Sequence, residues 1–125
     1  MKRRTPNRDY ARSARMNSLV KEILAEELDR IDDERLELVS LTSVDVATDL
    51  ATAIAYYDHS LGEDADEGVN EALEALRPRL QGAIARQTSI KATPILSFEP
   101  DKVVRSAARI EDVLRGLKQV GSDDA

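Results

Sequence analysis

Residues 71–86 (EALEALRPRLQGAIAR) have helical spacing from end to end, yet Pro78 lies at their centre. A proline inside a helix lacks an amide donor and clashes with the carbonyl four residues earlier, which costs about 3 kcal/mol. In the first turn of a helix, no amide partner is needed and the fixed φ of proline fits. Apolar residues continue at steps of three or four on both sides of Pro78, so both halves face one core. We therefore predict two helices that meet at a kink.

Helical periodicity also appears near both ends of the chain. An apolar stripe that starts at Met16 predicts a helix over residues 13–31, and a second stripe predicts a helix over residues 106–117. The tail GSDDA that follows is expected to fray.

Three segments have the patterns of strands. Residues 36–46 are rich in branched side chains and place four of them on one parity: Leu36, Leu38, Val44 and Val46. Residues 50–58 follow a short turn at 47–49, so the two strands are expected to pair as a hairpin, and the alanines of the second strand allow a helix to pack closely. Residues 89–101 alternate Ile90, Ala92, Pro94, Leu96 and Phe98 on one side.

The proline within residues 89–101 places that strand at a sheet edge or a bulge. Residues 59–68 carry two glycines and four acidic residues, and we expect a solvated loop there. The order of elements predicts an α+β fold with helices on one face of a three-stranded sheet and a final C-terminal helix.

Charge is distributed unevenly, although the net charge is −6. Residues 1–15 hold six basic residues against Asp9 alone, and residues 75–98 hold four basic residues and no acidic one. This asymmetry indicates a face or an arm for an anionic partner and an acidic remainder that favours solubility. An alternative interpretation is that the basic terminus is an ordinary tail and the other arginines are ordinary surface residues.

Composition excludes several other classes of protein. The 125 residues are enough for one domain, and no apolar run approaches the roughly 20 residues that span a bilayer. The start of the chain lacks the apolar segment of a secretory signal, so we expect a cytoplasmic protein with no membrane partner. The absence of cysteine agrees with a reducing compartment. The single phenylalanine and the lack of tryptophan weaken any mechanism that stacks bases on aromatic side chains.

Catalytic and metal-binding patterns are weak. His59, the only histidine, has no serine or cysteine nucleophile pattern nearby and is interpreted as a solvated turn residue. Asp45, Asp49 and Asp58 lack a ligand-spaced motif, and residues 63–67 (EDADE) lack the spacing and glycine of a calcium loop. We therefore expect no catalytic residue, no metal and no cofactor.

Four segments together resemble a known family. They are the R-x-x-R-M motif (Arg12, Arg15, Met16), DDERLELVSLTSVDVATDLATAIAYY at 32–57, TPILSFEPD at 93–101 and ARIEDVLRGL at 108–117. In this order and spacing, over residues 8–118, the chain resembles the ribosome-binding factor A family of bacterial small-subunit assembly factors.

The resemblance implies a KH-like fold of the second topological type, in which an interrupted Ala-x-Gly helix junction replaces the usual Gly-x-x-Gly loop. Here that junction falls on Leu76, Arg77 and Pro78, so proline replaces the family glycine. We expect a flexible basic arm at 1–11, the KH-like domain at 12–118 and a disordered acidic tail at 119–125.

The resemblance also implies a function without enzymatic activity. Family members bind free 30S subunits near the decoding region and the neck, assist late maturation and processing of 16S rRNA, and contribute to cold adaptation. Assembly GTPases are the implied functional neighbours that help release them. We expect this chain to be a monomer.

Arginine pairs bidentately with phosphate oxygens, and helix N-termini add amide donors, so the junction and the arm are the expected contacts with rRNA. The candidate RNA-binding residues are Arg3, Arg4, Arg8, Arg12, Arg15, Arg77, Arg79, Arg86 and Lys91. Lys102, Arg105 and Arg109 are further candidates, although acidic residues lie among them. The alternative is a protein-interaction module that docks on an assembly GTPase or a ribosomal protein through its acidic surface, with incidental RNA contact.

Overall fold

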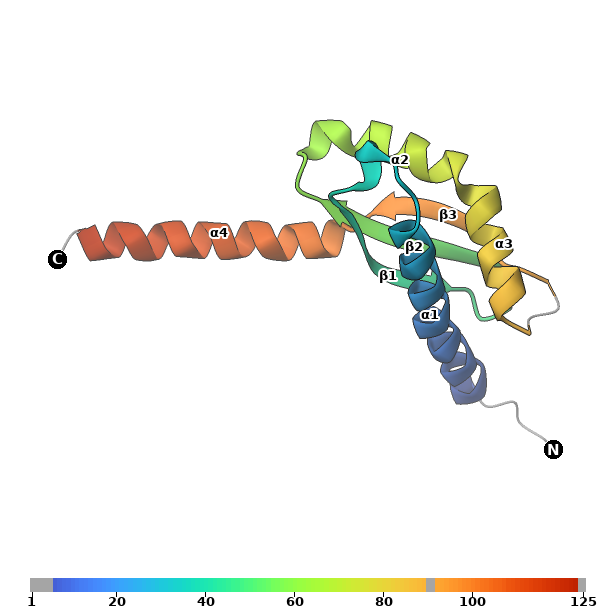
Figure 1. Cartoon of the computed structure of the whole chain (residues 1–125). Helices are drawn as coiled ribbons and strands as arrows, with labels where there is room; N and C mark the ends of the chain where they lie inside the picture. Colours follow the sequence, from blue (N-terminus) through green and yellow to red (C-terminus); the bar gives the residue numbers. More distant parts are fainter. Residues whose placement is uncertain (1–5, 90–91, 124–125) are drawn as a thin grey trace.

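The computed structural model describes residues 6–89 and 92–123. Within them, α1 (Pro6–Asp29), α2 (Asp66–Ala75) and α3 (Arg77–Gln87) cover one face of a three-stranded sheet, and α4 (Lys102–Asp123) projects from its end (Figure 1). The strands are β1 (Val39–Val46), β2 (Thr52–His59) and β3 (Ile95–Pro100), in the order β1-β2-β3. β1 and β2 are antiparallel, whereas β3 runs parallel to β2 after the crossover through α2 and α3. The α+β prediction is confirmed.

The core lies between this sheet and the three helices. In β2, Ala53, Ala55 and Tyr57 alternate onto the helix-facing side, and none is more than 1% exposed. Leu24 of α1 and Leu80 of α3, which the apolar spacing placed on the core side, are fully buried in the same cluster as these alanines. Each such leucine stabilises the fold by about 1.5–3 kcal/mol. α1, α3 and the sheet are therefore held in one packed unit.

β1 starts later than predicted. The Asp33 side chain accepts the amide of Arg35 at 3.0 Å, and residues Glu34–Leu36 form a short 3-10 turn before the strand. A bulge between Leu41 and Ser43 then shifts the register with β2. The prediction that Leu38 lies on the same side as Leu36, Val44 and Val46 is therefore wrong. Leu38 is 57% exposed, whereas the other three residues are buried.

The other strands are also shorter than predicted. Leu50 adopts a positive φ of 61° and donates its amide to the carbonyl of Ala47 at 2.8 Å, so the hairpin turn occupies the start of the predicted second strand. Pro94 is buried just before β3 rather than inside it. β3 is an edge strand, as the proline predicted. Ile90 lies outside the described residues.

α1, α2 and α4 begin earlier than predicted, and for α4 the Asp101 side chain caps the first turn by accepting the amide of Val104 at 2.9 Å. α1 begins at Pro6, whose fixed φ suits a first turn, and ends at Asp29, so residues 6–11 of the expected arm lie in this helix. α4 begins at Lys102, after Asp101. α2 begins at Asp66, inside the predicted loop. No helix among the described residues is long and apolar enough to cross a membrane.

Candidate RNA interface

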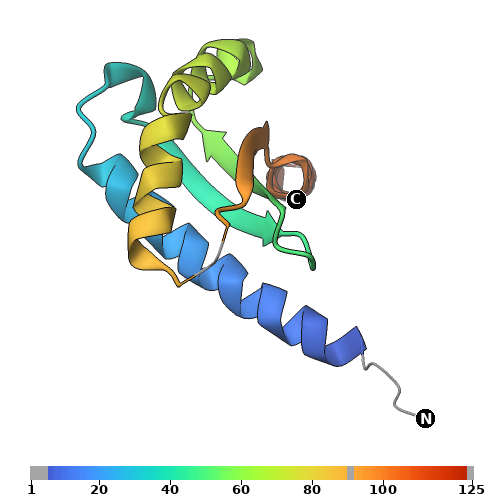
Figure 2. The same cartoon turned by 90° about the vertical axis from the view of Figure 1, so that its right-hand side faces the viewer.

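The junction between α2 and α3 is a true break. Leu76 separates the two helices with φ −91° and ψ −3°, and the chain turns sharply there (Figures 1 and 2). Pro78 lies in the first turn of α3, where its missing amide has no consequence. The first turn of α3 carries no acidic residue, and no side chain caps it. The kink prediction is confirmed, and the positive end of α3 is not neutralised locally.

Arg77 is partly occupied by structural contacts at this junction. Its Nη1 donates to the carbonyl of Leu96 in β3 at 3.5 Å, and its Nε lies 3.4 Å from Glu74 Oε2. The side chain is 43% exposed. Arg77 therefore joins the start of α3 to the edge strand, and part of its guanidinium still faces solvent.

Arg79 connects α3 to α1. Its Nε donates to Glu27 Oε1 at 2.9 Å, and Arg30 binds the other oxygen of Glu27 at 3.3 Å. The Glu27 side chain is only 6% exposed. The Arg79 hydrogen bond, which outweighs the effect of burial, lowers the pKa of Glu27. Arg79 thus neutralises a buried carboxylate, so its first role is structural.

The N-terminal half of α1 extends beyond the sheet and carries exposed arginines (Figure 1). Arg12 and Arg15 are both exposed, and no hydrogen bond or ion pair is formed by either within the described residues. Arg12 lines a hollow of about 480 Å³, together with Met16, the 49–51 turn, Ser89 and Ala92. This hollow is where α1, the hairpin turn and the segment after α3 meet, so two regions that the sequence marked as basic converge there.

Arg86 is exposed on the last turn of α3. It forms no hydrogen bond or ion pair in the described part of the chain, although its charge adds weakly to the lowered pKa of Glu27. The remaining candidates cannot be placed: Arg3, Arg4 and Lys91 lie outside the described residues, and so does the side chain of Arg8. Arg12, Arg15 and Arg86 are therefore the predicted residues that the structure leaves available to phosphate.

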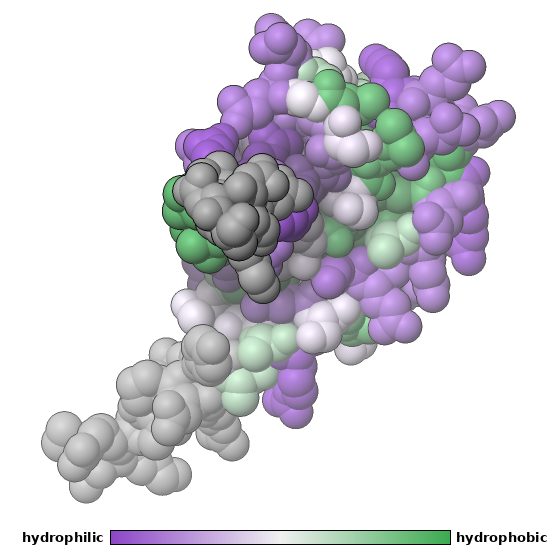
Figure 3. Space-filling model, turned by 90° about the vertical axis from the view of Figure 1, so that its left-hand side faces the viewer, coloured by the Kyte–Doolittle hydropathy of each residue, from purple (hydrophilic) through white to green (hydrophobic). Residues whose placement is uncertain are grey.

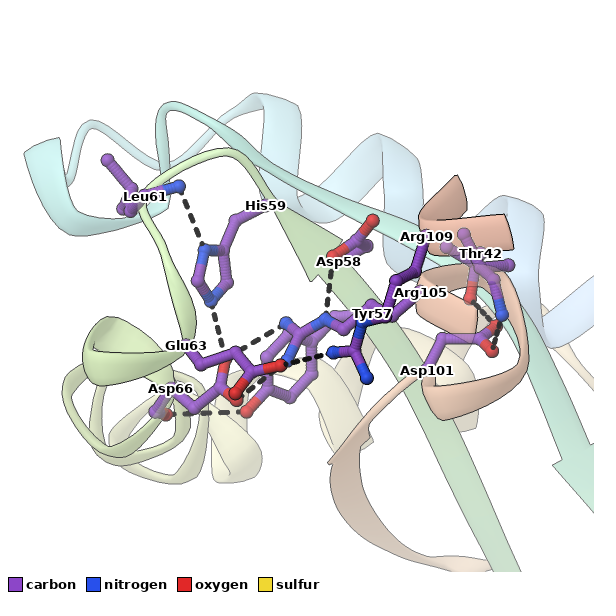
Figure 4. A network of polar contacts seen from close by, with 11 residues as sticks. Thr42, Tyr57, Asp58, His59, Leu61, Glu63, Asp66, Asp101, Arg105 and Arg109 are labelled. Atoms are coloured by element: carbon purple, nitrogen blue, oxygen red, sulfur yellow. Dashed lines mark hydrogen bonds and ion pairs between the residues drawn. The ribbon is translucent and has the colours of Figure 1, made fainter. Parts of the chain in front are cut away.

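A polar network at the base of α4 includes His59 and Asp58, two of the residues considered for catalysis and metal binding (Figure 4). The His59 side chain is 1% exposed, and its Nε2 lies 2.7 Å from Asp66 Oδ1. Leu61 donates its amide to Nδ1, which assigns the proton to Nε2. The interpretation of His59 as a solvated turn residue is therefore wrong, because a carboxylate and an amide satisfy both ring nitrogens in the interior.

Asp58, which was considered as a metal ligand, instead accepts a hydrogen bond from Arg105 Nε at 2.9 Å. Arg105 also binds both oxygens of Asp66, at 2.7 and 2.9 Å. Within residues 6–89 and 92–123, no group of three His, Cys, Asp or Glu side chains is arranged to hold a metal ion. Arg105, a further RNA candidate in the sequence, is thus engaged in holding α4.

The sequence alone did not predict the structural roles of Glu27 and Arg105. Glu27 lies four residues after Ile23 and three after Leu24, on the buried side of α1, and an acid in that position signals a buried partner. The Arg105 network joins residues far apart in sequence, and no local pattern marks it.

The antiparallel β1–β2 hairpin, the parallel β3 reached through α2 and α3, and the break at Leu76 define a KH-like fold of the second type. The Ribosome-binding factor A family profile matches residues 12–114. With nearly the whole domain matched, the chain belongs to the ribosome-binding factor A family.

Individual relatives agree with this assignment. Ribosome-binding factor A of Rubrobacter xylanophilus is 36% identical over 115 residues, which cover 91% of each chain. The protein of the same name from Acidothermus cellulolyticus is 38% identical over 108 residues, covering 85% of this chain and 71% of the relative.

Solved structures give the same result. The crystal structure of ribosome-binding factor A from Thermus thermophilus has a TM-score of 0.64 and 31% identity, and covers 70% of this chain and 93% of that chain. A homology model of the Thermus thermophilus factor, fitted into a cryo-EM map of its 30S complex, has a TM-score of 0.58 and 30% identity, and covers 69% of this chain and 91% of that chain.

Proposed function

We propose that this protein binds the free 30S small ribosomal subunit and assists the late maturation and processing of 16S rRNA, with a role in cold adaptation. Family membership supports the binding function, and the Thermus thermophilus relative occurs in a 30S complex. The proposal places the contact near the decoding region and the neck, gives the protein no enzymatic step, and makes assembly GTPases the factors that help its release. We further propose that it acts as a cytoplasmic monomer.

The observation that carries the RNA contact is the set of available arginines on α1 and α3. Arg12, Arg15 and Arg86 are exposed and unpaired within the described residues, whereas Arg77 and Arg79 already bind Glu74 and Glu27. Guanidinium groups bind phosphate oxygens bidentately, and such contacts position a protein on RNA without reading its sequence. The uncapped first turn of α3 adds amide donors beside Arg79. We propose that Arg12, Arg15 and Arg86 are the primary phosphate contacts.

The test measures binding to purified 30S subunits over a salt series. The test variant is Arg12→Glu with Arg15→Glu, and the matched control is Arg109→Glu with Arg115→Glu, which makes the same charge change on α4. If each arginine contacts one phosphate, the test variant should lose affinity and the slope of log K against log salt should fall by about two. The control should keep the wild-type slope.

The results distinguish an error in the proposed RNA face from an error in the proposed ribosome-binding function. If the test variant binds with the wild-type slope, the RNA face on α1 is wrong, and the alternative of docking through the acidic surface is favoured. If the unmodified protein ignores both mature and precursor 30S subunits, the ribosome-binding function itself is refuted.

The roles in processing and in the cold need a cellular assay. A strain that lacks the protein should accumulate precursor 16S rRNA, more so at low temperature, and the Arg12→Glu, Arg15→Glu variant should restore processing less well than the control variant. Normal 16S rRNA ends in the deleted strain at both temperatures would refute the proposed maturation role.

A further inference from the structure

α4 carries a broad apolar stripe that its own domain does not cover. At about 100° per residue, Val103, Ala107, Ile110, Leu114 and Leu117 share one side of the helix, and Val104 and Val113 flank them. The stripe spans about half of the helix circumference. Its large side chains are between 40% and 80% exposed: Val103, Val104, Ile110, Val113, Leu114 and Leu117.

The opposite side of α4 is the side that binds the domain. Arg105 is held by Asp58 and Asp66, and Arg109 Nη2 lies 3.0 Å from Glu63 Oε1 (Figure 4). At helical spacing, Arg105 lies about 180° and Arg109 about 140° from Leu114. Apolar side chains accordingly gather on one side of the projecting helix, and polar ones on the side toward the body (Figure 3). The domain cannot cover the stripe without breaking these ion pairs.

Val103 and Val104 of the stripe also line a hollow beside Tyr56 and Glu99, on the second face of the sheet. α1, α2 and α3 pack on the other face (Figure 2). This hollow has a volume of about 490 Å³, and its lining includes Tyr56, Glu99, Val103 and Val104. Among the described residues that line it, Lys102 is the one basic side chain.

Carboxylates border this combined surface. Asp45 and Glu99 are exposed on the same sheet face as Tyr56, and Glu111 lies about two helical turns beyond Val104 on the same edge of the stripe. None of the three forms a hydrogen bond or ion pair in the part of the chain that the structure describes. Burial, followed by the negative charges of Glu99, Asp45 and Asp101, raises the pKa of Tyr56, as expected for an acidic face.

We propose that the α4 stripe and the adjoining hollow dock a basic amphipathic helix of a partner protein. The apolar face of such a helix would cover the stripe, and its lysines or arginines would pair with Asp45, Glu99 and Glu111. RNA is disfavoured as the occupant because these carboxylates repel phosphate and the aliphatic side chains offer no hydrogen bonds. A second copy is disfavoured because a two-fold interface brings the same unpaired carboxylates together, and because a two-stranded seam needs only a narrow stripe.

The test uses defined peptides and no ribosomes, so its result is independent of 30S binding. The probe is a fluorescein-labelled peptide of about five helical turns, with leucine on one face and lysine on the other. A scrambled isomer keeps its charge without an apolar face, and a second control replaces lysine with glutamate. Fluorescence anisotropy at near-physiological salt should show that the probe binds about tenfold more tightly than either control.

Two paired variants locate the binding surface. Leu114→Gln with Leu117→Gln should weaken probe binding about tenfold, and Asp45→Asn with Glu99→Gln should weaken it about threefold. Glu22→Gln with Glu26→Gln removes two exposed carboxylates from α1 and should leave binding unchanged. Circular dichroism confirms that each variant is folded, which the exposure of these positions favours.

Three results would overturn the proposal. They are equal binding of the scrambled peptide, no effect of the Leu114 and Leu117 substitutions, and an equal loss of binding in the α1 control. Sedimentation that shows a dimer of the unmodified protein, abolished by the Leu114 and Leu117 substitutions, would assign the surface to a second copy instead.

Discussion

Arg105 should be the principal tether of α4, and replacing it with methionine tests this. Methionine keeps much of the aliphatic volume and removes three charge-assisted hydrogen bonds, to Asp58 and to both oxygens of Asp66. The Arg105 side chain is 16% exposed, and those of Asp58 and Asp66 are 31% and 26% exposed. Breaking a fully buried pair costs about 3–5 kcal/mol and breaking an exposed one costs below about 1 kcal/mol. The intermediate burial predicts a loss of about 2 kcal/mol.

Urea unfolding at neutral pH, followed by far-UV circular dichroism, measures this loss as a free energy of unfolding. For a domain of this length, a loss of about 2 kcal/mol lowers the Tm by roughly 8 °C. Arg109→Met is the matched control, because Arg109 and Glu63 form an ion pair in which both side chains are 70% exposed. That control should cost less than about 0.5 kcal/mol.

The pH dependence of the free energy of unfolding gives a second test of the contact between Arg105 and Asp66. The hydrogen bonds from Arg105 and then His59 lower the pKa of Asp66 in the folded protein. The stability from Asp66 is therefore present above its unfolded pKa, near 4, and is lost as pH falls through the lower folded pKa. Arg105→Met should flatten the loss of stability below about pH 4. The reasoning is refuted if Arg105→Met lowers the free energy of unfolding no more than Arg109→Met does and leaves the loss of stability below about pH 4 unchanged.

Three further substitutions have defined outcomes. Asp101→Ala removes the carboxylate that accepts the Val104 amide at 2.9 Å, so urea unfolding should show a loss of about 1–2 kcal/mol, whereas Asp101→Asn should retain most of the stability. Pro78→Ala should cost about 0.4–1 kcal/mol through the freer unfolded chain, and NMR chemical shifts should still show the break between α2 and α3. Glu27→Gln should lower the Tm in a thermal scan, because it removes the negative charge that Arg79 and Arg30 share; a Tm equal to that of the unmodified protein would contradict the anchoring role.

The sequence predicted the fold well because the fold depends on local periodicity. Apolar spacing predicted the helices, and the short turn between two strand patterns predicted the hairpin. Pro78 predicted the break at the junction, and Pro94 predicted the edge position of β3. The misplaced boundaries arose where a capping side chain or a positive φ outweighed the pattern, as at Asp33 and Leu50.

The candidate site was predicted less completely, because charge in a sequence does not reveal which charges are already paired. Arg77, Arg79 and Arg86 belong to one basic segment of the sequence, but the fold gives the first two carboxylate partners and leaves the third free of ion pairs within the described residues. Only the packing of α3 against α1 brings Arg79 to Glu27. A count of basic residues therefore overestimates how many arginines at the junction are free of carboxylate partners.

The geometry of the junction does not require a glycine. The bend occurs at Leu76, whose negative φ is accessible to any residue, so no position of the junction needs the left-handed conformation that favours glycine. Leu76 packs against the core and fixes the direction of the bend, and Pro78 adds to this by disfavouring a continuous helix. Because packing determines the angle, the bend should tolerate alanine, glycine or proline at position 78. The residues beside it can then serve the fold, as Arg77 and Arg79 do, while Arg12, Arg15 and Arg86 are exposed and form no ion pair within the described residues.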